Sequence, residues 1–335
     1  MQKTLLYSLV IASCALSASA QIGGIVNQVE NTQTRNELNQ SAQKQAGEGD
    51  TVPQLYDGES SDVGPQSVVQ TTPRRTLFAA EADVQFFYTD NMFLAEHQKQ
   101  STGVLLSTAQ FALAPTPFDL WNGSFAPQVG YRAQWFDFGL DGAMVKGFPL
   151  HLRDLDFNAQ TVFANALWTR GHWSFGAGLD GTKLFTMDYD SFYKELVPEW
   201  VAKFTLPIND RMTVSASYQG DYHVTDIDPQ FLDFATSDAS DRTDHALLLT
   251  YTQLICKHVV FEPYYQLKFT HYTDYPLGPR NDYLNSLGAG IYWLVCPNFS
   301  IRTFVDYDIL RTGNPNVAQY HKLDAGGGIN LTFRF

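Results

Sequence analysis

The chain has 335 residues, of which 44% are hydrophobic and 14% aromatic, enough for one large domain or two small ones with a real interior. This composition excludes overall disorder. The formal net charge of −13 argues against a nucleic-acid-binding protein, because such proteins present a basic surface.

The first twenty residues have the layout of a secretory signal peptide. A basic residue precedes an apolar run from Leu5 to Ala12, and the small-residue site "ASA" at 18–20 follows. We expect residues 1–20 to be removed. The alternative is a lipobox at 11–14 with Cys14 acylated, although its apolar run would be short. No later run reaches about 18 apolar residues, so we expect no membrane-spanning helix.

Residues 21–76 are rich in Gln, Asn, Ser, Thr and Gly and nearly free of aromatic residues. This composition predicts a periplasmic linker that is disordered or partly helical. A short polar helix between Ile25 and Gln45 is the helical alternative. Its apolar residues, Ile25, Val29 and Leu38, are too sparse for a packing seam, so we favour disorder.

From residue 77 onward the sequence alternates between apolar and polar residues, the period of strands that separate two environments. In the first segment Phe86 and Tyr88 share one face, while Asp83 and Gln85 share the other. Counting this one, the chain has about twelve such segments, at 77–89, 102–114, 124–138, 154–169, 173–187, 194–206, 211–222, 243–256, 259–272, 283–295, 299–310 and 319–335.

The length of these segments indicates what kind of sheet they form. Strands of globular proteins usually have about 5 to 6 residues, whereas these have roughly 12 to 16. At about 3.3 Å per residue and a tilt near 40°, a strand of about 13 residues rises about 33 Å, enough to cross an outer membrane. The sequence therefore predicts an all-β fold, a transmembrane antiparallel β-barrel of about 12 strands over residues 77–335.

The connections between segments alternate between tight turns and long loops. Tight turns fall near 170–172, 207–210, 256–258 and 296–298, and long loops fall between them. Such asymmetry is typical of an outer-membrane barrel, with both termini on the short-turn, periplasmic side. Aromatic residues lie near both ends of the segments, which predicts two interfacial girdles.

The last ten residues, "GGGINLTFRF", put Ile329, Leu331, Phe333 and Phe335 on one face of a strand that ends the chain. This strand resembles the C-terminal strand of bacterial outer-membrane β-barrel proteins of the porin-like kind. The resemblance implies a Gram-negative outer-membrane location and makes these four residues the signal that the barrel assembly machinery reads. Independently, the last strand must pair with the first, because unpaired backbone groups cannot face lipid.

Two cysteines remain after the expected signal peptide, Cys256 and Cys296, both at predicted periplasmic turns. The strand 259–272 lies between them. Two strand spacings are about 10 Å, beyond the roughly 7 Å that a disulfide allows between Cα atoms. A disulfide therefore requires the two turns to lean together, and the bonded and free states both stay open.

Catalytic motifs are weak, and we expect no enzyme, no metal and no cofactor. Asn122 and Ser124 resemble part of an outer-membrane phospholipase motif but lack a nearby upstream histidine. Asp306 and Asp308 could resemble paired protease carboxylates, yet their spacing follows from strand alternation. The loop 223–242 is rich in aspartate and could bind Ca²⁺ or bridge to lipopolysaccharide, but a solvated acidic loop is favoured.

Charged residues on the polar face are expected to line a lumen, an inversion that argues against a soluble lipocalin-like barrel. The predicted pore-lining residues are Glu81, Asp83, Arg132, Glu195, Glu199, Lys203, Asp221, Glu262, Lys268, Arg302, Asp306, Asp308 and Arg334. Twelve strands imply a narrow or partly plugged pore.

These features predict a passive channel for small polar or cationic solutes, with outer-membrane lipids and lipopolysaccharide as neighbours. The alternatives are an outer-membrane enzyme that modifies lipids or cleaves proteins, and a structural or export-accessory barrel that does not conduct.

Overall fold

The computed structural model describes residues 26, 28–35 and 38, and residues 76–335 except 141, 147–150 and 229–236. The predicted signal peptide and most of the predicted linker therefore lie outside the described residues. Among those described, no helix is both long and apolar enough to cross a bilayer. In the described part of the chain, the strands and the short 3₁₀ helix η2 are β1 (Phe78–Thr89), β2 (Thr102–Leu113), β3 (Phe118–Leu120), β4 (Gly123–Phe138), η2 (Leu152–Leu155), β5 (Phe157–Arg170), β6 (Trp173–Thr186), β7 (Ser191–Asn209), β8 (Met212–Ile227), β9 (Arg242–Cys256), β10 (Val259–Tyr272), β11 (Arg280–Cys296), β12 (Phe299–Thr312) and β13 (Tyr320–Arg334).

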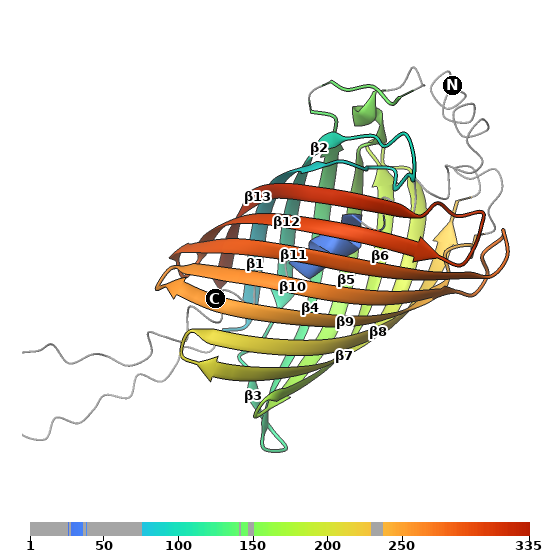
Figure 1. Cartoon of the computed structure of the whole chain (residues 1–335). Coiled ribbons are helices and arrows are strands. Elements are labelled where there is room, and N and C mark those ends of the chain that lie inside the picture. The colour runs from blue at the N-terminus through green and yellow to red at the C-terminus, as the bar shows by residue number, and fades with distance from the viewer. Residues whose placement is uncertain are drawn as a thin grey trace, which may run out of the picture.

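Twelve of the thirteen strands close into one antiparallel barrel (Figure 1). β1 pairs with β13, from Ala79 opposite Arg334 to Thr89 opposite Asp324. β2 pairs directly with β4, so the short strand β3 lies outside the ring as a hairpin extension of β4. Every strand of the ring has two neighbours, which leaves no open edge of unpaired backbone groups. The predicted fold class is confirmed.

The strands of the ring have 12 to 19 residues, and their positions agree with the predicted segments. One boundary differs clearly. β8 continues to Ile227, five residues into the predicted loop 223–242, because His223, Thr225 and Ile227 still alternate as buried residues with exposed ones. The acidic loop is correspondingly shorter than the sequence predicts.

The two faces of the strands have the polarity that the alternation predicts. In β12, Val305 and Tyr307 are exposed on the outer face, while Arg302, Asp306 and Asp308 are buried on the inner face. The outer surface carries most of the large exposed apolar side chains of the barrel, including several tryptophans. Such a surface suits the hydrocarbon region of a membrane.

The interior is not entirely polar. Phe136 and Phe157 stack inside the barrel with ring centroids 4.4 Å apart, and Phe87 lies in the same buried cluster. This cluster gathers near the ends of β1, β4 and β8 that carry the longer loops. The alternation of the sequence predicts only polar residues in the lumen, so this apolar region was not predicted.

A helix lies inside the barrel, seen in blue behind β11 and β12 in Figure 1. We call it the lumen helix; its described residues are 26, 28–35 and 38. Val26 and Val29 pack into the apolar cluster near the loop end, and Leu38 packs against Val260 and Tyr292 in a second cluster. The partly helical alternative for the predicted linker is confirmed at these residues, and the lumen provides the partners that a solvated polar helix would lack.

Candidate functional site

Glu30 fastens one side of the lumen helix to the barrel wall. Its carboxylate oxygen Oε1 accepts a hydrogen bond from Arg242 Nη2 at 2.6 Å, and Oε2 accepts one from Lys268 Nζ at 2.6 Å. Arg242 opens β9 and Lys268 lies on β10, so two adjacent strands hold one carboxylate. Burial alone would raise the pKa of Glu30, but the positive charges of Lys268 and Arg242 outweigh it and lower that pKa.

Arg35 fastens the helix to a different part of the wall. Its Nε donates to Asp306 Oδ2 at 2.7 Å, and its Nη2 donates to Asp324 Oδ2 at 2.8 Å. The guanidinium carbon lies 4.2 Å from the ring centroid of Phe304 and 4.8 Å from that of Phe87. Only 3% of Arg35 is exposed. Burial would lower the pKa of Arg35, but the two carboxylates raise it, so this residue stays charged.

The two anchoring residues of the helix, Glu30 and Arg35, carry opposite charges and bind different parts of the wall. Glu30 reaches β9 and β10, whereas Arg35 reaches β12 and β13, and Asn31 adds a hydrogen bond of 3.3 Å to Asp308. With Val29 and Leu38 packed in separate apolar clusters, the helix is fixed at several points of the lumen. In this position it occupies part of the lumen.

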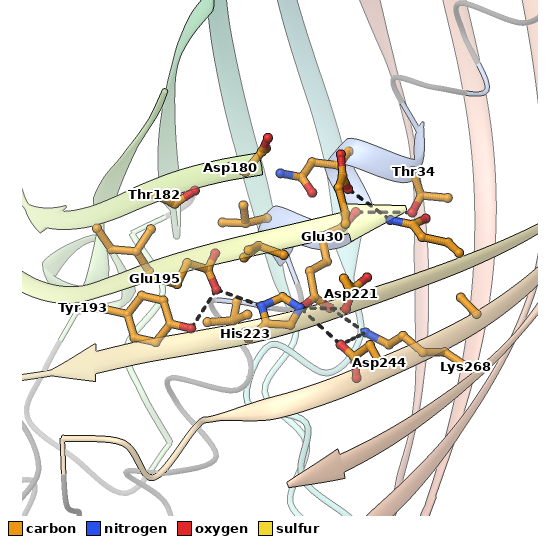
Figure 2. Close-up of a pocket in the computed structure, with 18 of the residues that line it drawn as sticks. Glu30, Thr34, Asp180, Thr182, Tyr193, Glu195, Asp221, His223, Asp244 and Lys268 are labelled. Carbon is orange, nitrogen blue, oxygen red and sulfur yellow. Dashed lines mark hydrogen bonds and ion pairs between the residues drawn. The ribbon is translucent and has the colours of Figure 1, made fainter. Parts of the chain in front are cut away.

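A cavity of about 90 Å³ remains between the lumen helix and the wall formed by β6 to β10 (Figure 2). This volume holds a few water molecules. Carboxylates dominate its lining, while Lys268 and His223 are the basic groups there. The acidic residues that line the cavity are Glu30, Asp180, Glu195, Glu199, Asp221 and Asp244.

His223 links several of these carboxylates. Its Nδ1 lies 3.1 Å from Glu195 Oε2, and its Nε2 lies 3.1 Å from Asp221 Oδ1 and 3.5 Å from Asp244 Oδ2. Tyr193 donates its hydroxyl proton to Glu195 at 2.9 Å. Figure 2 shows the imidazole between these groups, with Lys268 on the far side of Asp244.

Glu30, His223 and Asp244 bring potential metal ligands within 4.8 Å of one another. The donor set does not fit a metal site, however. Arg242 and Lys268 both bind Glu30, and Arg242 lies 3.2 Å from Asp244 as well, so a cation would have to displace two permanent positive charges. We therefore assign these residues to the ion-pair network that holds the helix.

The barrel resembles solved outer-membrane proteins. An outer-membrane channel from Pseudomonas putida F1 matches with a TM-score of 0.50 and 10% identity, over 77% of this chain and 96% of the other. The chain folds as an outer-membrane β-barrel. The β domain of the Bordetella autotransporter BrkA gives a TM-score of 0.45 at 11% identity, covering 78% of this chain and all of that domain. The NanC porin gives 0.40 at 11% identity, covering 75% and 98%. No family model and no curated protein matches the sequence.

Strand alternation places the predicted pore-lining residues on the inner face of this outer-membrane barrel, with different degrees of burial. Fully buried are Asp83, Glu262, Arg302, Asp306 and Asp308. Partly exposed are Glu81, Arg132, Glu195, Glu199, Lys203, Asp221 and Lys268, whereas Arg334 at the end of β13 is exposed. The structure brings Glu195, Glu199, Asp221 and Lys268 together around the cavity, while Asp306 and Asp308 bind the lumen helix on another part of the wall.

Two groups of site residues were absent from the predicted set. Glu30 and Arg35 lie within the predicted linker, and Phe87 and Phe304 are aromatic residues on a face expected to be polar. One signal in the sequence could have identified the aromatic pair: both interrupt the polar face of an otherwise regular alternation. Nothing local identifies Glu30 and Arg35, because their partners lie more than 200 residues away.

Cys256 and Cys296 are exposed free thiols in the structure, and no disulfide joins them. β10 lies between the strands that end in these residues, which is the separation that the sequence predicted.

The weak catalytic motifs are engaged in structural contacts or lie at turns. Asp306 binds Arg35 and also accepts a hydrogen bond from Tyr264 at 2.7 Å, and Asp308 lies 3.3 Å from Lys322. Asn122 belongs to the tight turn between β3 and β4, beside the first residues of β4. Asp306 and Asp308, which resemble a pair of protease carboxylates, are thus both bound by cations.

Acid is expected to loosen the lumen helix through Glu30. The pKa of Glu30 is lower in the docked helix than its ordinary value of 4.5, so its contribution to docking is complete above about pH 4.5. This contribution declines as the pH falls and is lost below the docked pKa. Amide hydrogen-exchange protection of residues 28–35 should therefore fall with acidification. The Glu30→Gln variant should show lower protection at neutral pH and a smaller change in acid; an unchanged wild-type profile would contradict the assignment.

Proposed function

We propose that this protein is an outer-membrane channel whose lumen is closed at rest by its own lumen helix and that passes small polar or cationic solutes when the helix shifts. The observation that carries this proposal is the attachment of the helix by Glu30 and Arg35 to opposite charges on the lumen wall. Both termini of the barrel, at Phe78 and Phe335, would then face the periplasm, and the long loops would face the lipopolysaccharide leaflet.

The type of attachment supports movement of the helix. A permanent core element is usually held by extensive apolar packing, whereas this helix contributes few apolar side chains and several charged contacts. Glu30 is partly exposed, so its pairs with Arg242 and Lys268 can exchange with water and dissolved ions, because water restores the solvation that docking removes. The pairs of Arg35 are buried, so their release needs a competing cation. The helix is thus suited to leaving its position without unfolding the barrel.

The preference for cations is supported by the lining of the cavity. Glu199, Asp180 and Asp221 project into it from three adjacent strands, and carboxylates outnumber the basic groups. In a confined passage with low-dielectric walls, such a surplus raises the local concentration of cations.

Reversal-potential measurements in a salt gradient test the selectivity. The full chain in a planar bilayer is expected to prefer K⁺ over Cl⁻ several-fold, less so as ionic strength rises and screening shortens the field. The triple variant Glu195→Gln, Glu199→Gln, Asp221→Asn is expected to move the permeability ratio most of the way to unity. A matched control, Glu96→Gln on an exposed loop, should leave it unchanged.

Two results would contradict the proposal. An anion-selective pore would show that the carboxylates of the cavity do not set the selectivity. A chain that inserts and folds but never conducts, even with the helix displaced, would favour the structural or export-accessory barrel instead.

A further inference from the structure

The wall residues around Arg35 form a compact box. Asp306 and Asp324 bind two nitrogens of its guanidinium, and the rings of Phe87 and Phe304 lie 4.8 Å and 4.2 Å from its central carbon. We call Phe87, Phe304, Asp306 and Asp324 the guanidinium box. Tyr264 fixes Asp306 by donating to its other oxygen, Oδ1, at 2.7 Å.

The pairing of the wall strands is sufficient to bring the four box residues together. Gly326 on β13 lies opposite Phe87 of β1 on one side and opposite Phe304 of β12 on the other. Asp324 lies opposite Asp306 in the next inward-facing row. A Cβ atom at Gly326 would collide with the Cβ atom of Phe87 and the carbonyl oxygen of Phe86, so the glycine allows β1 to bring Phe87 close to β13. The four box residues come from three consecutive strands of the closed barrel.

The chemistry of the box matches a guanidinium better than an ammonium group. A guanidinium is planar and offers donors in a fixed fork, so it can bind two carboxylates while its faces lie against aromatic rings. An ammonium group is a compact, strongly hydrated charge and cannot satisfy both requirements at once. Asp306 and Asp324 are both buried, and Lys322 on β13 lies 3.3 Å from Asp324, so Asp306 is the carboxylate whose charge most needs a cation in the box.

We propose that the guanidinium box is a solute-binding site of the channel, occupied at rest by Arg35, and that it takes small solutes with a free guanidinium, such as arginine. This inference rests on the proposed function, because a solute reaches the box only through the lumen. Arg35 then acts as an internal substitute for the solute. A guanidinium solute that competes for the box removes one anchor of the lumen helix and favours its release.

The test uses the full chain with Arg35→Ala, which empties the box and keeps every wall residue. Isothermal titration in detergent micelles with ethylguanidinium and with ethylammonium measures the preference of the vacant box. We expect ethylguanidinium to bind at least about tenfold more tightly, because only it forms the forked and stacked contacts. Adding Asp306→Asn and Asp324→Asn to Arg35→Ala should abolish the difference. Equal binding of the two cations, or no binding, would overturn the proposal.

A separate measurement distinguishes this inference from the proposed function. The bilayer current of Arg35→Ala reports on closure by the helix, whereas the titration reports on the box. A raised current without preference for ethylguanidinium refutes the box and leaves the channel; preference without raised current supports the box and argues against closure by the helix. Should Arg35→Ala fail to assemble, the wild type decides: L-arginine should increase its current at a concentration about tenfold lower than L-lysine. Equal action of the two amino acids would refute the box.

Discussion

Exchanging the two anchoring charges of the lumen helix, Glu30→Lys together with Arg35→Glu, is expected to open the channel. The exchange leaves the net charge of the chain unchanged. It places a lysine beside Arg242 and Lys268, and a glutamate beside Asp306 and Asp324. Like charges brought together in this way cost several kcal/mol, so the ratio of docked to released helix should fall by more than about a hundredfold. Single-channel recording should show long open states where the wild type is mostly closed.

An equivalent exchange on the surface provides the control. Glu96 and Lys257 are both exposed, so Glu96→Lys together with Lys257→Glu also preserves the net charge but touches neither anchor. Its conductance should match that of the wild type. A wild type that is already open, or a helix variant that records like this control, would show that the lumen helix does not close the pore.

Deleting residues 326–335 is expected to abolish the assembled barrel. β13 pairs with β12 on one side and with β1 on the other, and the deletion exposes an edge on each of those strands. The backbone of Phe335 adds the last bonds of the closure: its carbonyl accepts from Leu77 and Phe78 at 3.0 Å and 2.9 Å. Open strand edges cannot face lipid, so the ring cannot close. The wild type should migrate faster on gels before boiling than after it, and the truncated chain should lose this difference.

A single substitution at the last residue provides the control for the deletion, because it leaves the closing strand in place. Phe335→Tyr keeps an aromatic ring beside Phe78, whose ring centroid lies 6.0 Å away, and keeps all backbone bonds. This variant should assemble in cells at nearly the wild-type level. Normal surface levels of the truncated chain would refute the role of the last strand as the closing strand.

The barrel could be predicted from the sequence because each strand separates two environments over its whole length. In β12, Val305 and Tyr307 face outward and Asp306 and Asp308 face inward, so the alternation is visible within a few residues. The strand lengths then excluded a soluble sheet. Even the carboxylates around the cavity, such as Glu195 and Glu199, were assigned to the inner face by the same period.

The lumen helix could not be predicted in the same way. Its stability depends on charges of distant strands, and its own apolar residues, Val26, Val29 and Leu38, do not form a regular seam. The inward aromatics were missed for a related reason. Phe87 and Phe304 pack against Arg35 and in a buried apolar cluster, whose members are far apart in the chain, so neither strand shows locally what its inward aromatic ring contacts.

The position of the lumen helix in the chain constrains the order in which the molecule can be completed. The helix precedes β1 and is made first, yet the strands that bind Arg35 are β12 and β13, which are made last. Docking of the helix therefore brings together residues that are separated by nearly the whole polypeptide. Contacts between residues so far apart in the chain are slow to form. Capture of the helix belongs to the end of biogenesis, when β13 meets β1. Until then the nascent wall carries Asp306 and Asp324 without the arginine that binds both, and Lys322 beside Asp324 supplies part of the compensating charge.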